Sequence, residues 1–300
     1  MWLIFLLYFL YAIIFVIGKF ALQVAEPIFL TGVRMVCAGM LSYGLHCTLY
    51  PKGKQLSHVK RYEWLILFLL ALFNVYITNG GEFWSLQYLS ASKTSFIYNL
   101  SPFFVLIFSA MLFSEKITST KLIGIAIGFF SLIPMIVGTE SIDITHHFGD
   151  VSIAELVMLC SAAATALGWV LMRYFIHKKT FTPYFLNGVS LTIGGMMCLL
   201  HAYAFESRPF IMGSTQDFWW YMLIMMFIQN IIAYNLHAFL LHQYSATWIS
   251  LFSFVMPLMT LLISNVFLSE PITWMFLVCS VGVGLGLLIF YKEELRSKLC

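Results

Sequence analysis

The chain contains one stretch of sequence that occurs twice, 155 residues apart. Residues 90–118 read SASKTSFIYNLSPFFVLIFSAMLFSEKIT, and residues 245–273 read SATWISLFSFVMPLMTLLISNVFLSEPIT. Ten of the 29 aligned positions are identical, and no gap is needed. Self-similarity at a fixed spacing indicates a duplicated structural unit. We therefore predict two tandem repeats, at residues 1–140 and 150–300.

Each predicted repeat contains five apolar stretches long enough to cross a membrane as a helix. Hydrophobic residues make up 61% of the chain and charged residues only 10%, which leaves too little polar surface for a soluble domain. A helix needs roughly 20 apolar residues to span the hydrocarbon core. We expect an all-α polytopic membrane protein with ten transmembrane helices, at residues 2–18, 27–49, 64–88, 94–113, 119–138, 152–172, 182–204, 218–241, 247–268 and 273–291.

The odd number of helices per repeat constrains how the two halves are arranged. A second copy that follows five spans enters the membrane from the opposite side. The repeats are therefore predicted to be inverted relative to each other, as in many secondary transporters. The first stretch has no basic leader and no small-residue cleavage site, so we interpret it as a retained span.

The distribution of basic residues predicts the orientation, because cytoplasmic loops carry the excess of Lys and Arg. With the N-terminus inside, the cytoplasmic segments hold 12 of these residues and the outer segments only Lys19, Lys93 and Arg208. This predicts a multi-pass protein of the inner (cytoplasmic) membrane with both termini in the cytoplasm. The net charge of +3 then reflects topology and does not indicate a nucleic-acid partner.

The repeated stretch resembles the EamA family, the ten-helix branch of the drug/metabolite transporter (DMT) superfamily. In that family the fourth helix of a repeat begins with small residues, carries a proline and ends in an acidic residue. Here these are Ser90-Ala91-Ser92, Pro102 and Glu115, and again Ser245-Ala246-Thr247, Pro257 and Glu270. The resemblance spans the whole chain. It implies a carrier with a central cavity lined by helices one to four and six to nine, and with helices five and ten at the periphery.

Two motifs that occur once in each repeat are interpreted as structural. Gly124-xxx-Gly128 and Gly282-xxx-Gly286 lie in the predicted peripheral helices, where small residues let another helix approach closely. Ser114-Glu115 and Ser269-Glu270 precede helix starts, where a serine and an early acid cap free N–H groups.

Charged side chains at membrane depth are the first candidates for a binding site, because burying one in lipid costs about 2.5–3.5 kcal/mol even on the lenient insertion scale. Arg34 lies eight residues after Glu26, roughly 12 Å along its helix from the outer end. Its counterpart in the second repeat is Ser190, so the scaffold itself does not require an arginine. We predict that the planar fork of Arg34 binds a substrate carboxylate. The alternative is a structural arginine that pairs with an acid or reaches toward the interface.

Gating or coupling is assigned to Glu82, Lys93, Pro102 and Pro257. Glu82 is the best intramembrane carboxylate for proton coupling, and a Glu82–Lys93 ion pair across the hairpin is the structural alternative. Each proline removes a backbone hydrogen bond inside a predicted helix. Each is therefore either a hinge that lets half a helix swing or a fixed kink.

Polar and aromatic residues near mid-membrane complete the predicted site. Amides at this depth serve equally well as hydrogen bonds between helices, and Trp169 either packs or stacks on a substrate ring or cation. The predicted substrate-binding residues are Arg34, Asn79, Glu82, Tyr98, Asn99, Trp169, Gln229, Asn230 and His237.

The sequence gives no support for an enzyme. It contains no P-loop, HExxH or GxSxG motif. His146-His147, with Asp143 and Asp150, is interpreted as a solvated loop in preference to a metal site. The six cysteines have no CxxC spacing and are interpreted as packing residues without disulfides. We expect neither a metal nor a cofactor.

These features predict a secondary carrier that moves a small polar metabolite by alternating exposure of a central cavity. The YNLSPF stretch at Tyr98–Phe103 and the phenylalanine-rich composition are similar to EamA carriers of obligate intracellular bacteria. Some of those carriers exchange S-adenosylmethionine for S-adenosylhomocysteine, and the resemblance implies this exchange as the leading function. An amino-acid or metabolite exporter and a non-transporting membrane scaffold stay open. The expected partners are the metabolite and the lipid bilayer; a homodimer also stays open.

Overall fold

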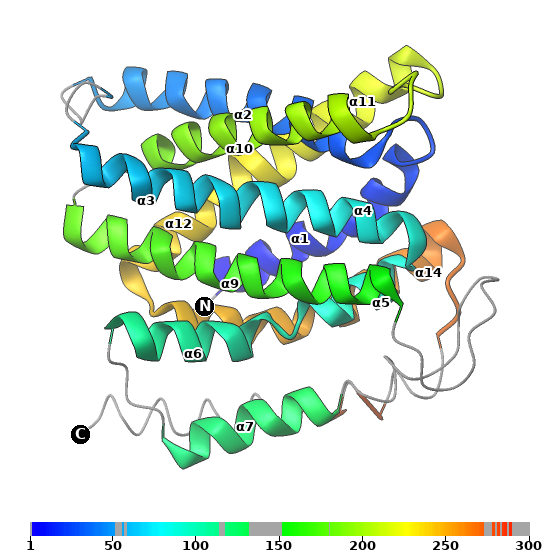
Figure 1. Cartoon of the computed structure of the whole chain (residues 1–300). Coiled ribbons are helices and arrows are strands. Elements are labelled where there is room, and N and C mark those ends of the chain that lie inside the picture. Colours follow the sequence, from blue (N-terminus) through cyan, green and yellow to red (C-terminus); the bar gives the residue numbers. More distant parts are fainter. Residues whose placement is uncertain are drawn as a thin grey trace.

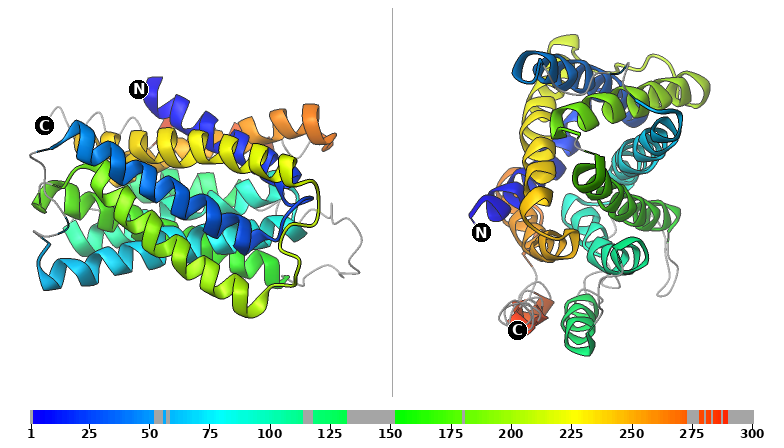
Figure 2. Two further views of the ribbon diagram at one scale, coloured as in Figure 1. Left: turned by 90° about the horizontal axis from the view of Figure 1, so that it is seen from above. Right: turned by 90° about the vertical axis from the view of Figure 1, so that its left-hand side faces the viewer.

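A computed structural model describes residues 2–51, 56, 59–113, 118–131, 152–179 and 181–272, and the short helical pieces 278–279, 281–282, 284–286 and 288–289. Within these ranges the chain is helical apart from short connections. Most of the helices run along one common direction, and α7 lies at one edge of the bundle (Figures 1 and 2).

The described helices follow the predicted spans closely. In the first half they are α1 (Trp2–Ala21), α2 (Pro27–Leu49), α3 (Arg61–Ala71), η2 (Leu72–Gly80), α4 (Gly81–Tyr88), α5 (Ala91–Tyr98), α6 (Ser101–Phe113) and α7 (Ser119–Phe130). In the second half they are α9 (Ile153–Lys179), α10 (Pro183–Phe205), α11 (Thr215–Met225), η3 (Met226–Ala233), α12 (Tyr234–Gln243), α13 (Ala246–Leu251), η4 (Phe252–Phe254) and α14 (Val255–Leu268).

Eight helical stretches in the described residues are long and apolar enough to cross a membrane. They are Trp2–Ala21, Pro27–Leu49, Arg61–Tyr88, Ala91–Phe113, Ile153–Ile176, Pro183–Phe205, Thr215–Gln243 and Trp248–Leu268. This confirms a polytopic membrane protein. The predicted spans 119–138 and 273–291 lie partly outside the described residues, as do Ser114-Glu115 and the His146-His147 loop.

The second helix of each half runs antiparallel to its counterpart. At one end, Glu206 after α10 accepts hydrogen bonds from the first backbone N–H groups of α2, at Ile28 (2.6 Å) and Phe29 (2.7 Å). At the other end, the α10 cap Thr182 contacts His46 Nδ1 of α2 at 2.8 Å. Partial burial raises the pKa of the Glu206 carboxyl. Each end of this pair is thus fastened by a polar contact between the two halves.

Both halves contain a helix that is interrupted just before a proline. In the first, α5 ends at Tyr98 and α6 begins at Ser101, directly before Pro102. In the second, the 3₁₀ segment η4 stands between α13 and α14, which carries Pro257 in its first turn. A proline ring clashes with the carbonyl four residues earlier and offers no N–H. The predicted bends are therefore present as breaks in both halves.

The third span of each half contains a π-helical segment that the sequence did not predict. In the first half it is η2 and in the second η3, at equivalent places. Such segments widen the helix by one residue per turn and occur frequently at functional sites. Both carry polar residues that point into the protein.

The predicted close approach of another helix to the glycine pairs is found, and the approaching segments are the two predicted peripheral helices themselves. A Cβ atom added to Gly286 would lie 2.6 Å from the carbonyl oxygen of Gly124 and 2.9 Å from the nitrogen of Gly128. These distances are shorter than real Cβ contacts, so only glycine fits there. The backbones of α7 and the helical piece at residues 284–286 therefore touch directly.

Candidate functional site

Two polar side chains from opposite halves of the chain meet inside the bundle. Arg34 of α2 donates a hydrogen bond from Nη1 to Gln229 Oε1 of η3 at 2.7 Å, and its guanidinium lies 4.4 Å from the ring centroid of Phe83. Arg34 is fully buried, and its Nε and Nη2 have no hydrogen-bond partner in the described part of the chain. The predicted intramembrane arginine therefore has donors to spare. No acid forms an ion pair with it among the described residues.

A second contact joins equivalent positions of the two π-helical segments and their flanks. The hydroxyl of Tyr234 donates to Asn79 Oδ1 at 3.0 Å, and these residues are 155 positions apart. The Asn79 amide donates in turn to the carbonyl oxygens of Asn74 and Val75, at 3.2 and 3.3 Å. Asn79 thus satisfies backbone carbonyls of η2 and positions a tyrosine of the other half.

Two neighbouring cavities lie among the helices that the resemblance predicted to line one. The first has a cavity volume of about 20 Å³ and is lined by Tyr8, Tyr11, Tyr98, Ser101, Val105, Thr165, Ala166, Trp169, His237, Ala246, Ser250 and Ser253. The second has a cavity volume of about 10 Å³ and is lined by Tyr11, Phe15, Glu82, Tyr98, Gln229, Tyr234 and Met256. In this conformation each cavity has room for about one water molecule. Tyr11 and Tyr98 line both cavities, so the two spaces are neighbours.

The first cavity has an aromatic wall. The imidazole of His237 stacks on Trp169 with ring centroids 3.7 Å apart and an interplanar angle of 22°. Its Nδ1 is 3.2 Å from the hydroxyl of Tyr11. The Trp169 ring also meets Tyr234 edge to face at 5.5 Å. Both predicted residues, Trp169 and His237, therefore line the first cavity, and each ring packs against the other.

The second cavity is lined by one charged side chain, Glu82. Glu82 is 3% exposed, and no hydrogen bond or ion pair reaches its carboxylate among the described residues. Gln229 lines the same cavity, and Arg34 stands behind it, close enough for its charge to act on Glu82. Arg34 itself lines neither cavity. In this conformation it acts on the cavity through Gln229.

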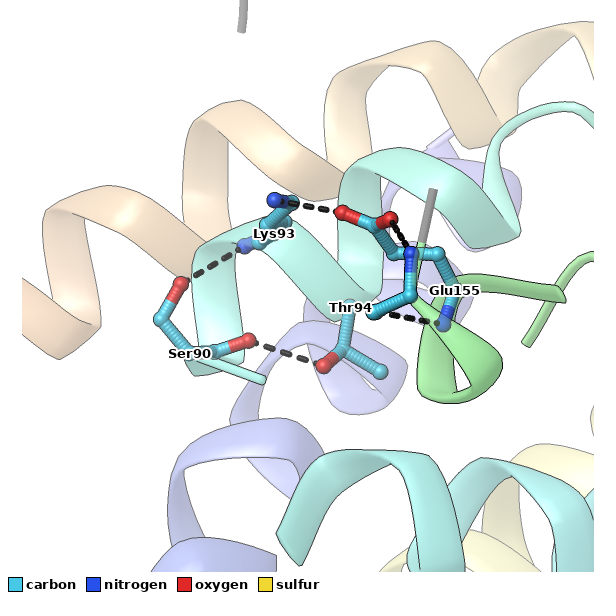
Figure 3. A network of polar contacts seen from close by, with 5 residues as sticks. Ser90, Lys93, Thr94 and Glu155 are labelled. Atoms are coloured by element: carbon cyan, nitrogen blue, oxygen red, sulfur yellow. Dashed lines mark hydrogen bonds and ion pairs between the residues drawn. The ribbon is translucent and has the colours of Figure 1, made fainter. Parts of the chain in front are cut away.

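The alternative ion pair between Glu82 and Lys93 is not found. Lys93 instead pairs with Glu155 of α9, with Nζ 2.6 Å from Oε1, and Figure 3 shows this contact beside the Ser90 cap of α5. Glu155 also accepts a hydrogen bond from the backbone N–H of Ser152 at 2.7 Å. Lys93 is one turn into α5 at the end of the bundle, so it reaches the neighbouring helix and not the cavity.

The interpretation of Ser269-Glu270 as a cap for the following helix is wrong. Ser269 ends α14 in the left-handed conformation (φ 56°), and the Glu270 carboxylate caps α5. It accepts hydrogen bonds from the backbone N–H groups of Ala91 (2.9 Å) and Ser92 (3.2 Å) and from the hydroxyls of Ser92 and Ser264. The acid does favour a helix N-terminus, but the helix belongs to the other half of the chain.

The remaining predicted residues are buried near these cavities. Asn99 caps the end of α5 inside the break, and neither its Oδ1 nor its Nδ2 has a hydrogen-bond partner in the described residues. The Asn230 amide donates to Met35 Sδ at 3.2 Å, and its Oδ1 has no partner there. No group of three or more His, Cys, Asp or Glu in the described residues is arranged to hold a metal ion.

Comparison with known proteins now gives the family. The model of the EamA-like transporter family matches the chain twice, over residues 1–137 and 152–292. The chain belongs to the EamA-like transporter family. Both matches together cover most of its length, and each falls on one predicted repeat.

Several curated relatives of this EamA-like transporter have a named activity. It is 30% identical over 98% of its length to proteins named S-adenosylmethionine/S-adenosylhomocysteine transporter from Chlamydia trachomatis serovar L2 and Chlamydia muridarum, and covers 90% and 92% of them. It is 28% identical over 86% of its length to an uncharacterized transporter, YvbV, of Bacillus subtilis, of which it covers 80%. A solved crystal structure superposes with a TM-score of 0.72 at 14% identity, over 98% of this chain and 96% of that one, which shows the fold alone.

The aromatic residues of α1 that line the cavities of this EamA-like transporter were not predicted from the sequence. Tyr8, Tyr11 and Phe15 of α1 line the cavities, yet in the sequence they are three aromatics in an apolar helix. Spacing offers one signal in retrospect: Tyr8, Tyr11 and Phe15 are three and four residues apart, so they share one face of α1. Nothing local distinguishes that face from one that packs against lipid.

Proposed function

We propose that this EamA-like transporter is a secondary carrier that exchanges S-adenosylmethionine for S-adenosylhomocysteine across the inner membrane. The observation that carries the proposal is the convergence of Glu82, Gln229 and aromatic rings on one buried cavity, with Arg34 behind it. Both nucleosides carry an amino-acid end and an adenine ring. The polar groups suit the former, and the Trp169–His237 wall suits stacking with the latter.

The proposal includes ten transmembrane helices arranged as two inverted repeats. Two observations support inversion: the antiparallel pairing of α2 with α10 and the contact between the counterparts Asn79 and Tyr234. The matched helix breaks before Pro102 and Pro257 support the duplication itself. Contact between counterparts is expected at an axis that relates two halves. Two inverted halves exchange their conformations when the site turns from one side of the membrane to the other.

The contacts at the start of α5 also fit a carrier, because they hold the bundle together at one end of the first cavity. Glu270 and Glu155 hold the start of α5, whereas the first cavity extends toward Ala246 and Tyr8 at the opposite end. With the predicted topology, the closed end is the outer one. Opening it requires α5 to leave Glu270 and Glu155, with the break after Tyr98 as the hinge.

Buried polar atoms argue for a carrier over a membrane scaffold. A scaffold satisfies its polar side chains with neighbouring helices, because an unsatisfied buried group costs about 1–3 kcal/mol. In the described residues, both side-chain atoms of the Asn99 amide and two nitrogens of Arg34 have no such partner. Neither residue lines either cavity in this conformation, so a ligand would reach these groups only after the helices move.

Counterflow into proteoliposomes tests the exchange. The purified chain is reconstituted into liposomes loaded with S-adenosylhomocysteine, and uptake of labelled S-adenosylmethionine is followed. Uptake should exceed that of unloaded liposomes and should stop when the internal pool is exhausted. Amino-acid efflux without nucleoside uptake would favour the exporter, and absence of all transport in a folded, reconstituted protein would favour the scaffold.

A further inference from the structure

Four aromatic residues and one carboxylate line the second cavity together. Glu82 shares this space with Tyr11, Phe15, Tyr98 and Tyr234. The rings are joined in edge-to-face pairs, Phe15 with Tyr98 at 6.1 Å and Tyr11 with Tyr234 at 6.3 Å between centroids. They come from α1, α5 and α12, so three separate segments place aromatic side chains around one acid.

The carboxylate lacks a bound cation from the protein itself. Lys93 is held by Glu155 and Arg34 by Gln229. Among the described residues, Glu82 receives no hydrogen bond. A buried carboxylate without a direct partner costs free energy unless a cation reaches it or it takes up a proton. Arg34 acts on Glu82 only from behind Gln229, so among the described residues no cation touches the carboxylate and the site suits a positive charge brought by a ligand.

The residues that line the second cavity favour one kind of cation. Aromatic faces carry negative charge density and attract cations that are weakly hydrated, with most effect where water is excluded. A metal ion such as Ca²⁺ needs six or more oxygen ligands, but the cavity offers one carboxylate, three tyrosine hydroxyls and an amide oxygen already used by Arg34. Two of those hydroxyls are also engaged, with His237 and Asn79.

We propose that Glu82 and the rings of Tyr11, Phe15, Tyr98 and Tyr234 form a binding site for an onium group, a sulfonium or a quaternary ammonium. Such a cation cannot donate a hydrogen bond from its charged atom, so it needs a counter-ion and π faces and not a set of directed acceptors. The inference deepens the proposed exchange, on which it rests for the identity of the substrate. Of the two nucleosides, only S-adenosylmethionine carries a sulfonium; S-adenosylhomocysteine has a neutral thioether at that position.

Gln229 offers a donor for the carboxylate of the ligand. Arg34 donates hydrogen bonds only, so the Gln229 atom that faces it is Oε1, and the Gln229 NH₂ is free to donate. The same cavity therefore has an acceptor for a cation at Glu82 and donors for a carboxylate at Gln229. This arrangement suits the amino-acid end of a sulfonium compound, which carries both charges within a few bonds.

The test compares ligands that differ by the charge on sulfur. Binding of S-adenosylmethionine and S-adenosylhomocysteine to the full chain in lipid nanodiscs is measured by calorimetry for the parent, for Glu82→Gln and for the exposed-site control Asp217→Asn. We expect Glu82→Gln to weaken S-adenosylmethionine binding by about tenfold or more, and S-adenosylhomocysteine binding by less than about threefold. Asp217→Asn should change neither. An equal loss for both nucleosides in Glu82→Gln would overturn the onium site.

Two substitutions of Tyr234 test the aromatic ring and the hydroxyl separately. Tyr234→Phe keeps the π face and loses the hydrogen bond to Asn79, whereas Tyr234→Leu loses both. The selectivity for S-adenosylmethionine over S-adenosylhomocysteine should persist in Tyr234→Phe and decrease in Tyr234→Leu. If Tyr234→Leu does not fold, the Glu82→Gln comparison still decides.

A second ligand pair separates this inference from the proposed function. S-Methylmethionine and methionine also differ by a sulfonium but lack the nucleoside. If the parent binds neither nucleoside yet binds S-methylmethionine more tightly than methionine in a Glu82-dependent way, the exchange fails and the onium site stands. If the parent binds both nucleosides but Glu82→Gln leaves their ratio unchanged, the exchange stands and the onium site fails. If the parent prefers neither charged ligand, the onium site is also wrong.

Discussion

At the residue scale, a donor-only side chain determines how a neighbouring amide faces the cavity. The guanidinium of Arg34 has five N–H donors and no acceptor, so the Gln229 amide must turn its oxygen toward it. The ring of Phe83 covers one face of the guanidinium at 4.4 Å. The guanidinium is therefore held in place, and it influences the cavity by orienting the Gln229 amide that lines it.

Replacing Arg34 tests whether it reads a substrate carboxylate. Arg34→Lys keeps the charge but loses the planar fork and the stacking on Phe83. If Arg34 binds the carboxylate directly once the helices move, affinity for a carboxylate-bearing substrate should fall by roughly tenfold to a hundredfold, since a charge-assisted hydrogen bond contributes about 1.5–3 kcal/mol. Transport of the parent and the variant is measured with the free acid and with its methyl ester.

The control for this change is Arg208→Lys, because Arg208 is exposed and its guanidinium also lies over a ring, 4.2 Å from the centroid of Tyr203. It should leave both substrates unaffected. If Arg34→Lys is well folded and still discriminates between acid and ester as the parent does, Arg34 has no role in carboxylate recognition. Poor expression of Arg34→Lys alone would indicate a structural arginine.

At the element scale, α5 is a half-helix held at one end and broken at the other. Its N-terminus is fastened by Glu270 of the other half and by the Lys93–Glu155 ion pair, which is largely buried. At its C-terminus the buried amide of Asn99 lies in the break. We expect a segment of eight residues with these two boundaries to move independently of α6.

Loosening the Glu270 contact should favour movement of α5. Glu270→Gln keeps an acceptor but removes the negative charge from the helix N-terminus, a loss of about 1–2 kcal/mol that shifts a two-state equilibrium roughly five- to thirtyfold. A cysteine placed at Ser95, which is buried on α5, should then react faster with a water-soluble thiol reagent. The measurement uses a chain whose six native cysteines are replaced by alanine.

Glu206→Gln is the matched control, because Glu206 caps α2 at two backbone N–H groups in the same manner. No break follows within α2, so this change should lower thermal stability without exposing position 95. Equal labelling of the two variants would show that α5 does not open through Glu270.

The breaks in α5–α6 and α13–α14 were predictable, and the role of Glu270 was not. A proline acts on the turn that precedes it, so Pro102 and Pro257 reveal the breaks in the local sequence. Glu270 caps a helix that begins 179 residues earlier in the chain, and no local pattern reports such a contact. The π-helical segments were missed for a related reason, since their extra residue is stabilised by side chains such as Asn79 and not by propensity.

At the scale of the whole molecule, the sequence predicts the spans better than the site between them. Each helix in lipid must satisfy its own backbone, so hydrophobic runs mark the spans one by one. Which faces meet in the middle depends on packing between distant segments. Arg34 was found because an arginine is costly at that depth, whereas Tyr11 and Phe15 were missed because aromatic residues are equally at home against lipid.

The inverted arrangement makes a prediction that concerns the whole molecule. Because α2 and α10 are counterparts and run antiparallel, the residues that follow them lie at opposite ends of the bundle. Tyr50 follows α2 and is 42% exposed, and Met212 follows α10 and is 51% exposed. In a cysteine-free chain, a cysteine at position 212 should react with a membrane-impermeant reagent in intact cells. A cysteine at position 50 should react only after permeabilisation, because the excess of Lys and Arg assigns that side to the cytoplasm.

The same experiment extends to the loops at residues 139–150, expected outside, and 52–60, expected inside. Reaction of positions 50 and 212 from the same side would exclude inverted halves, and with them an exchange of conformations between the halves. Reaction of both positions from the sides opposite to those expected would keep the inversion and reverse the orientation, so that the end closed by Glu270 would face the cytoplasm.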